Sequence, residues 1–300
     1  MNRSRLADLS LLLVAMMWGS TFLIVQHAVR VLPPLAFNSI RFIGAALLLA
    51  IIITVFYRQQ WRSLSWAMLL HGGVLSLFLF MGYAFQTVGL LYTSTSNAGF
   101  ITGLSVVLVP FLSLLLLKQP ISLFTWISAL LAAAGLYFLA FAGTAFSLNK
   151  GDFLIFLCAI GFALHIAYSG IFAPKYPGLL LAAVQMASVG VLSLIASSFM
   201  EDLGSMQQTI DMVMEPKVLW GLLISIGPTS AFAFWIQMVC QKFTTPSRVA
   251  IIFATEPVFA AITGVTFGGE TLGLYAGIGC LCILLGMILA ELKFTPRRLQ

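Results

Sequence analysis

Residues 36–56 read AFNSIRFIGAALLLAIIITVF, an apolar run in which Arg41 is the only charged side chain. A helix of about twenty such residues crosses the ~30 Å hydrocarbon core of a bilayer. Nine further apolar runs of similar length follow one another along the chain: Leu9–Gln26, Ala67–Leu91, Ala98–Leu117, Leu123–Phe141, Phe153–Phe172, Leu179–Phe199, Val218–Cys240, Val249–Phe267 and Leu272–Leu292. The sequence therefore predicts an all-α membrane protein with ten transmembrane helices.

The composition excludes most other classes of protein. Of 300 residues, 61% are hydrophobic and 8% are charged, and the mean hydropathy is +1.06. A soluble domain carries about 25% charged residues, and disordered chains are richer still in polar residues. A transmembrane β-barrel would show alternating segments of about ten residues instead of continuous runs. The net charge is +6, but the basic residues are scattered through short loops and form no nucleic-acid-binding motif. We therefore expect no nucleic-acid partner.

The loop charges predict the orientation in the membrane. If the N-terminus is cytoplasmic, eleven Lys and Arg residues lie inside: Arg3, Arg5, Arg58, Arg62, Lys118, Lys175, Lys242, Arg248, Lys293, Arg297 and Arg298. Only three lie outside: Arg30, Lys150 and Lys217. Positive residues concentrate on the cytoplasmic side of membrane proteins. Both termini are therefore predicted to be cytoplasmic, which requires an even number of spans, in a multi-pass protein of the inner (plasma) membrane.

The chain contains two copies of one unit. A shift of 151 residues places Gln86 on Gln237, Thr93 on Thr244 and Ser105 on Glu256, and a shift of 144 places Asp8 on Asp152. The units are residues 1–146 and residues 147–300, with five spans each. Because five is odd, the second unit enters the membrane from the opposite side, as in the inverted repeats of many secondary transporters. The substrate path is then expected at the interface between the repeats.

Several short motifs resemble one transporter family. These are Trp18-Gly19-Ser20, Tyr92-Thr93-Ser94 followed by Asn97-Ala98, and Glu256-Pro257-Val258-Phe259-Ala260-Ala261. In this order, and within two five-span repeats, they resemble the EamA family of the drug/metabolite transporter superfamily. The resemblance implies a ten-helix inner-membrane transporter of metabolites, often an exporter of amino acids or related compounds. The chain departs from the family at Lys118-Gln119, where Gly-Glu is common, but keeps Gly269-Glu270 in the second half.

Glu256 is the most informative single residue. It lies eight residues into the ninth run, ~12 Å from the nearer end. An ionised carboxylate at that depth must be paired or wetted. It could hold a neighbouring helix by a hydrogen bond, line the path and contact substrate, or carry a coupling proton. Pro257 removes a backbone donor and predicts a kink. On a continuous helix, one polar stripe would contain Arg248, Thr255, Glu256, Thr263 and Thr266.

Other polar residues within the runs are further candidates for the substrate path. Arg41 could extend to the outer headgroups or contact a substrate carboxylate. His165 could be a hydrogen-bonded packing residue or a proton relay. The remaining candidates could line the path or hold helices together by hydrogen bonds: Tyr83, Gln86, Asn97, Ser105, Thr229, Trp235 and Gln237. In the connection of residues 200–217, apolar residues recur at helical spacing, which predicts a short helix on the membrane surface.

These observations favour a secondary transporter of small organic metabolites such as amino acids or related amphipathic compounds, working by alternating access. No GxxxxGK[ST] loop is present, so direct ATP coupling is not expected. The scarcity of interior cations argues against phosphorylated sugars. We expect no cofactor and no metal. The partners are a small-molecule substrate and the lipid bilayer, and the oligomeric state stays open. A passive, channel-like facilitator is an alternative. A membrane-embedded enzyme is disfavoured, because the interior ionisable residues lie on three separate spans.

Overall fold

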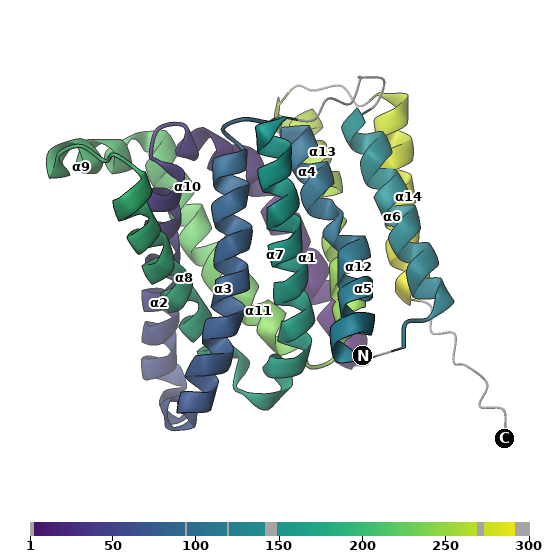
Figure 1. The fold of residues 1–300 in the computed structure, drawn as a ribbon, viewed down its shortest axis with the longest axis horizontal. Helices are drawn as coiled ribbons and strands as arrows, with labels where there is room; N and C mark the ends of the chain where they lie inside the picture. Colours follow the sequence, from purple (N-terminus) through teal and green to yellow (C-terminus); the bar gives the residue numbers. More distant parts are fainter. Residues whose placement is uncertain (1–2, 94, 119, 142–148, 269–272, 292–300) are drawn as a thin grey trace.

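The computed structural model describes residues 3–93, 95–118, 120–141, 149–268 and 273–291, and these ranges contain helices and no strand (Figure 1). The predicted all-α class is thus confirmed for the described chain. Its first half contains α1 (Arg3–Val29), α2 (Pro34–Phe56), η1 (Arg58–Ser63), α3 (Trp66–Gly89), α4 (Thr95–Gly103), α5 (Ser105–Leu117) and α6 (Leu123–Phe141). Gln119, Gly269-Glu270 and the C-terminal Lys293, Arg297 and Arg298, which entered the sequence predictions, lie outside the described residues.

The second half has the same general plan with more interruptions. It contains α7 (Lys150–Phe172), η2 (Ala173–Lys175), α8 (Gly178–Met200), α9 (Met206–Met214), α10 (Pro216–Ile226), the π-helical turn η3 (Gly227–Phe232), α11 (Ala233–Cys240), α12 (Pro246–Phe253), α13 (Glu256–Gly268) and α14 (Leu274–Glu291). We call the end of the bundle where α1 and α12 begin the lower end, and the end where α2 and α7 begin the upper end, as they appear in Figure 1.

Seven helical segments in the described chain are long and apolar enough to cross a membrane: α2, α3, the α4–α5 pair, α6, α7, α8 and the segment from α10 to α11. The helix α1, which bends by 46° between Thr21 and Leu23, would be an eighth. The apolar part of α14 is shorter (Leu274–Ala290), and the ninth predicted run is divided into α12 and α13. The protein is therefore a helical membrane protein, while the count of ten spans stays a prediction.

The helices pack in a regular pattern of pairs. α2 runs along α8, α6 along α14 and α3 along α7. In addition, α1 contacts α10, α11, α12 and α13, whereas α7 contacts α3, α4 and α5. The α6–α14 pair is close enough to need glycine, since a Cβ on Gly279 would lie 2.6 Å from the carbonyl oxygen of Gly135. Each first helix thus packs mainly against the third and fourth helices of the other half.

Both halves contain a broken fourth helix. The breaks fall at Leu104, between α4 and α5, and at Ala254–Thr255, between α12 and α13. The carbonyl of Leu104 accepts hydrogen bonds from the N–H groups three and four residues ahead, at 3.0 and 3.2 Å, and the carbonyl of Thr255 does the same at 3.0 and 3.3 Å. Leu104 and Thr255 are related by the shift of 151 residues. Pro257 follows one break, but Val106 occupies the equivalent place at the other, so proline is not required.

The breaks change one expectation about side chains. The polar stripe of Arg248, Thr255, Glu256, Thr263 and Thr266 assumed a continuous helix, and that assumption is wrong because the helix is interrupted at Ala254–Thr255. Thr255 is buried and donates to the carbonyl of Ile252 at 2.6 Å. Arg248 is therefore separated from Glu256 by the break, and it contacts a different part of the molecule.

The predicted helix in the connection of residues 200–217 is present as α9. Its Ser205 and Gln208 form a reciprocal capping box, and its apolar side chains Met206, Ile210 and Met214 are exposed. In Figure 1, α9 projects sideways from the upper end of the bundle. An exposed apolar face at this level fits a helix that lies in the membrane interface.

Glu201, at the beginning of this connection, caps the start of α2. Its two carboxylate oxygens accept from the backbone N–H groups of Leu35 at 2.7 Å and Ala36 at 2.8 Å, and Ser197 donates to the second oxygen at 2.8 Å. A carboxylate at a helix N-terminus satisfies free N–H groups and interacts favourably with the helix dipole. Glu201 thereby joins α8 to α2 at the upper end.

Glu201→Ala is expected to destabilise the protein by about 1–2 kcal/mol, because two N–H groups lose their partner. This corresponds to a melting temperature about 2–5 °C lower, measured by thermal unfolding in detergent micelles. Asp202→Ala is the matched control, since within the described part of the chain the Asp202 carboxylate accepts only from the N–H of Gly204, in an exposed turn. Equal melting temperatures for the two variants would contradict the capping role.

Candidate substrate site

A cavity of about 760 Å³ lies in the middle of the bundle between the two halves of the chain. Its walls follow α1 from Trp18 to Val25 and α13 from Glu256 to Thr263, and both of these segments run toward the upper end. Leu139 and Ala140, at the end of α6, and Ala276, at the start of α14, also line it. The cavity therefore extends from mid-bundle to the upper end.

The lining includes eight of the ten residues that the sequence proposed for the path: Arg41, Tyr83, Gln86, Ser105, His165, Thr229, Gln237 and Glu256. The other two are Asn97 and Trp235. Asn97 donates to the Asp152 carboxylate at 3.3 Å, and Trp235 packs beside the core around Phe234 with its ring perpendicular to that of Phe232. The placement of Asn97 and Trp235 outside the cavity follows from their helix phase, which depends on how neighbouring helices are rotated.

Glu256 begins α13 and presents its carboxylate to the cavity. Among the interactions of the described residues, this carboxylate has neither a hydrogen bond nor an ion pair; the charge that interacts with it most strongly is that of Arg41 across the cavity. An acidic side chain in a membrane interior cannot hold two helices together when it has no hydrogen-bonded partner. The geometry therefore favours contact with the cavity contents over hydrogen bonding to a neighbouring helix.

Arg41 is buried and turned into the bundle, so it does not extend toward the upper surface. Its Nε donates to Ser230 Oγ at 2.6 Å, and its Nη2 lies 3.4 Å from both the carbonyl oxygen and the hydroxyl of Thr229. The guanidinium also lies over the ring of Tyr83, 4.8 Å from its centroid. The π-helical turn η3 widens the helix at Thr229 and Ser230, which brings both residues to Arg41.

His165 lines the floor of the cavity and is tied to a neighbouring helix. Its Nε2 lies 2.7 Å from Gln185 Oε1 on α8, and its ring meets that of Phe234 edge to face. The Gln185 amide also donates to the carbonyl of Leu181 at 3.4 Å. The arrangement holds the imidazole in one orientation while leaving it on the cavity wall.

The cavity walls contain repeat-related pairs of residues. Gln86 and Gln237 are related by the shift of 151, as are Tyr83 and Phe234, and the shift of 144 relates Trp18 to Phe162; all six line the cavity. Trp18 also donates from Nε1 to the carbonyl of Thr229 at 2.8 Å. The sequence pointed to Trp18 only as part of the Trp18-Gly19-Ser20 motif, and Phe234 and Phe162 were not among the predicted path residues. Applying the repeat shift to Tyr83, which was chosen, would have found Phe234.

The lower end of the cavity is closed by an apolar cluster. It contains Leu11 of α1, Val109 of α5, Ile166 of α7, and Val249 and Ile252 of α12. Gln241, at the end of α11, donates to the carbonyl of Ile166 at 2.5 Å beside this cluster. Lys242 Nζ donates to the carbonyl of Tyr176 at 2.6 Å. We call this region the lower closure.

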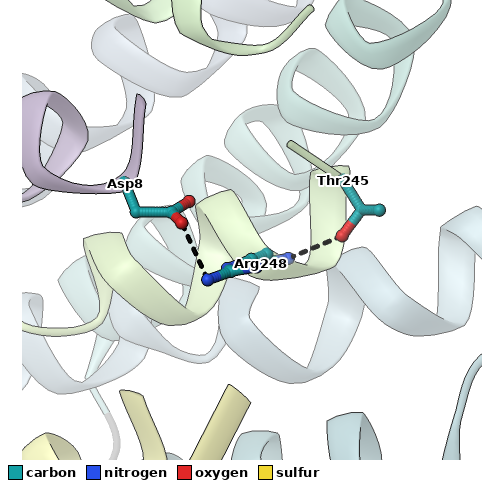
Figure 2. Close-up of polar contacts among 3 residues, drawn as sticks. All are labelled: Asp8, Thr245 and Arg248. Carbon is teal, nitrogen blue, oxygen red and sulfur yellow. Dashed lines mark hydrogen bonds and ion pairs between the residues drawn. The ribbon is translucent and has the colours of Figure 1, made fainter. Parts of the chain in front are cut away.

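Arg248 forms an ion pair at the lower closure that the sequence did not predict. Its Nη2 lies 2.7 Å from the Asp8 carboxylate of α1, and Thr245 accepts from the backbone N–H of Arg248 at 3.4 Å (Figure 2). Asp8 is 2% exposed and Arg248 is 15% exposed. The described residues contain no group of three His, Cys, Asp or Glu side chains suited to hold a metal ion.

Comparisons with known proteins agree with this architecture. The sequence profile of the EamA-like transporter family matches residues 5–141 and again residues 149–292. An "Uncharacterized transporter" of Archaeoglobus fulgidus is 33% identical over 96% of this chain and 86% of its own length. The "Uncharacterized inner membrane transporter YedA" of Escherichia coli K12 is 24% identical over 92% of this chain and 87% of its own length.

A solved crystal structure shares the fold, with a TM-score of 0.74 at 20% identity, over 95% of this chain and 98% of that one. The resemblance noted in the motifs is confirmed by the family match, which covers nearly the whole chain in two consecutive stretches. The chain is thus a membrane protein of the EamA-like transporter family.

Proposed function

We propose that the protein is a secondary transporter that exports small organic metabolites, such as amino acids or related amphipathic compounds, by alternating access between two inverted five-helix repeats. One observation carries the proposal: a cavity between the halves contains a carboxylate without a hydrogen-bonded partner, opposite a guanidinium, and extends to one end of the bundle only. A solute with a cationic group and an apolar body fits Glu256 and the aromatic walls.

The repeat relation supports a role of the charged pair in binding. The counterpart of Glu256 is Ser105, and the counterpart of Arg41 is Gln185, so each charged position has a neutral equivalent in the other half. The two halves build similar helices around these positions, which indicates that the fold does not need the charges. A substrate that carries charge does need them, because buried cavities stabilise a charged group only through a partner.

Helix packing supports the inverted repeat and the ten spans. The pairs α2–α8 and α6–α14 each join equivalent helices, as expected beside a two-fold axis. On α6, Gly135 lies against Gly279 of α14, and its counterpart Gly286 lies against Ser128, the counterpart of Gly279. In this proposal α12 and α13 together form the ninth span and α14 the tenth. The substrate path then passes between the repeats.

The positive residues support an orientation with the lower end in the cytoplasm of a cell with an inner membrane. Arg58, Arg62, Lys118, Lys175 and Lys242 all lie in connections at that end. The curated E. coli relative is named an inner membrane transporter, which fits the same location. Both termini are then cytoplasmic, and the cavity faces the outside.

The lower closure favours a carrier over a passive, channel-like facilitator, since a carrier closes one end while the other is open. An enzyme is not proposed, because the relatives are named transporters. Glu256 and His165 are the groups proposed for proton coupling, since both lie on the cavity wall.

Counterflow in proteoliposomes tests the proposal. We expect accumulation of a labelled amino acid or amine from a panel of metabolites, driven by the same unlabelled compound inside, and competition by amphipathic amines. An imposed pH gradient is expected to change the rate if proton coupling operates. Conductance without saturation or counterflow would contradict a carrier and favour the facilitator.

A further inference from the structure

Each half carries an aspartate at an equivalent place near the start of its first helix. Asp8 on α1 pairs with Arg248 at the start of α12, at 2.7 Å. Asp152 on α7 accepts from the Thr93 hydroxyl at 2.5 Å and from Asn97 of α4 at 3.3 Å. Asn97 and Arg248 are themselves related by the shift of 151 residues, so both aspartates reach the same position of the other half's fourth helix.

The two contacts lie at opposite ends of the bundle. Asp8 and Arg248 are at the lower end, where α1 and α12 begin, and Asp152 is at the upper end, where α7 begins. Both carboxylates are buried. Asp152 is further held by the capping box with Asn149, whose N–H donates to Oδ2 at 2.9 Å. Each contact therefore joins one first helix to one half of a broken fourth helix.

The two broken helices differ in what else they touch. At the lower end, α12 packs against both α5 and α7 and closes the cavity there. At the upper end, its counterpart α4 makes few contacts with α13 and with α1 among the described residues, and the cavity extends to that end. The contacts α12–α5 and α12–α7 correspond, under the repeat, to α4–α13 and α4–α1. One end is thus closed by contacts that the other end largely lacks.

We infer that α12 and α4 are the two gates of the transport cycle, and that Asp8 and Asp152 are positioning residues that make each gate move with the first helix of the other repeat. The inference rests on the proposed alternating access. When the protein switches, α1 and α12 move as one unit away from α5 and α7. At the other end, α7 and α4 move as one unit, so that α4 closes on α13 and α1. The breaks at Leu104 and at Ala254–Thr255 are the hinges.

Thiol reactivity tests this coupling without any substrate. In a background in which Cys158, Cys240, Cys280 and Cys282 are replaced by alanine, Leu112→Cys puts a reporter on α5 in the lower closure. Asp8→Asn is expected to raise the alkylation rate of this cysteine at least about fivefold, because α12 opens more often. Asp152→Asn is the matched control at the other gate and is expected not to raise it.

Charge exchange separates coupling from simple loss of stability. Asp8→Asn is expected to reduce the transport rate about tenfold. The double variant Asp8→Arg with Arg248→Asp is expected to restore both the slow alkylation and the transport rate. If Asp8→Asn and Asp152→Asn lower the melting temperature equally and leave alkylation unchanged, the two aspartates are ordinary structural ties and the inference is wrong.

Cross-linking identifies the moving units. In the same background, a short bis-thiosulfonate that bridges Asp8→Cys and Arg248→Cys is expected to restore transport, since α1 and α12 move together. A bridge between Leu112→Cys of α5 and Val249→Cys of α12, which belong to one apolar cluster on two helices that are expected to separate, should stop transport until it is reduced. The opposite pattern would overturn the inference. If no variant transports but the alkylation rates change as stated, the assignment of α12 and α4 as gates is supported and the proposed substrates are wrong.

Discussion

Glu256→Ser is expected to lower kcat/KM for transport at least about 100-fold while the protein still folds. Serine is the residue that the chain itself uses at the equivalent position, Ser105, so the helix tolerates it. The carboxylate, in contrast, has no hydrogen-bonded partner among the described residues, and its loss removes a charge-assisted contact to a cationic substrate. Counterflow in proteoliposomes, at equal amounts of monodisperse protein, measures the effect.

Two further variants make this result interpretable. Thr266 lies on the same helix, is exposed and is outside the cavity lining, so the Thr266→Ala variant should transport at the wild-type rate. Glu256→Gln keeps the size of the side chain. If it transports normally and responds normally to a pH gradient, Glu256 neither binds a cation nor carries the coupling proton. If each Glu256 variant instead fails to fold, the carboxylate has a structural role and the binding interpretation is wrong.

Gly279→Ala is expected to lower the stability more than Glu201→Ala does. The added Cβ would lie 2.6 Å from both the carbonyl oxygen of Gly135 and the backbone nitrogen of Leu139, so α6 and α14 must separate. Backbone atoms cannot rotate away as a side chain can. Overpacking of this kind costs on the order of 2–3 kcal/mol, or about 4–7 °C in melting temperature, measured in detergent micelles.

Gly73→Ala is the matched control for this prediction. A Cβ at Gly73 meets no atom within 4 Å, so the same chemical change should be neutral or stabilising by up to about 1 kcal/mol. Equal melting temperatures for Gly73→Ala and Gly279→Ala would show that the α6–α14 pair can separate at little cost. The close pairing of these equivalent helices would then not be a rigid element of the fold.

Much of the candidate site could be predicted because charge is rare in this chain. With 8% charged residues, an ionisable group within an apolar run stands out, and both Glu256 and Arg41 line the cavity. The amides Gln86 and Gln237 were chosen as polar residues within apolar runs, and they also line the cavity. Asn97 was chosen as a polar residue of the fourth run and Trp235 as an aromatic residue beside the polar face of the eighth run, and the structure places both outside the cavity lining.

Local backbone geometry was harder to predict. Pro257 suggested a kink in one fourth helix, but nothing in the sequence around Leu104 suggested the equivalent break, which forms without proline. The π-helical turn at Gly227–Phe232 was likewise not predicted, although it brings Thr229 and Ser230 to Arg41. Such features arise where packing against neighbours outweighs the small energy difference between i+3, i+4 and i+5 hydrogen bonding.

By itself, the sequence determined the class of the protein and the few residues that could carry charge inside a membrane, and it predicted a division into two related units. These follow from the length of apolar runs and from the high cost of burying charge, which act locally along the chain. Only the tertiary structure decided that each first helix packs with the opposite half, that Arg248 pairs with Asp8, and that the cavity is closed at one end. Those choices depend on how whole helices fit together, because apolar side chains pack against many alternative partners at similar energy.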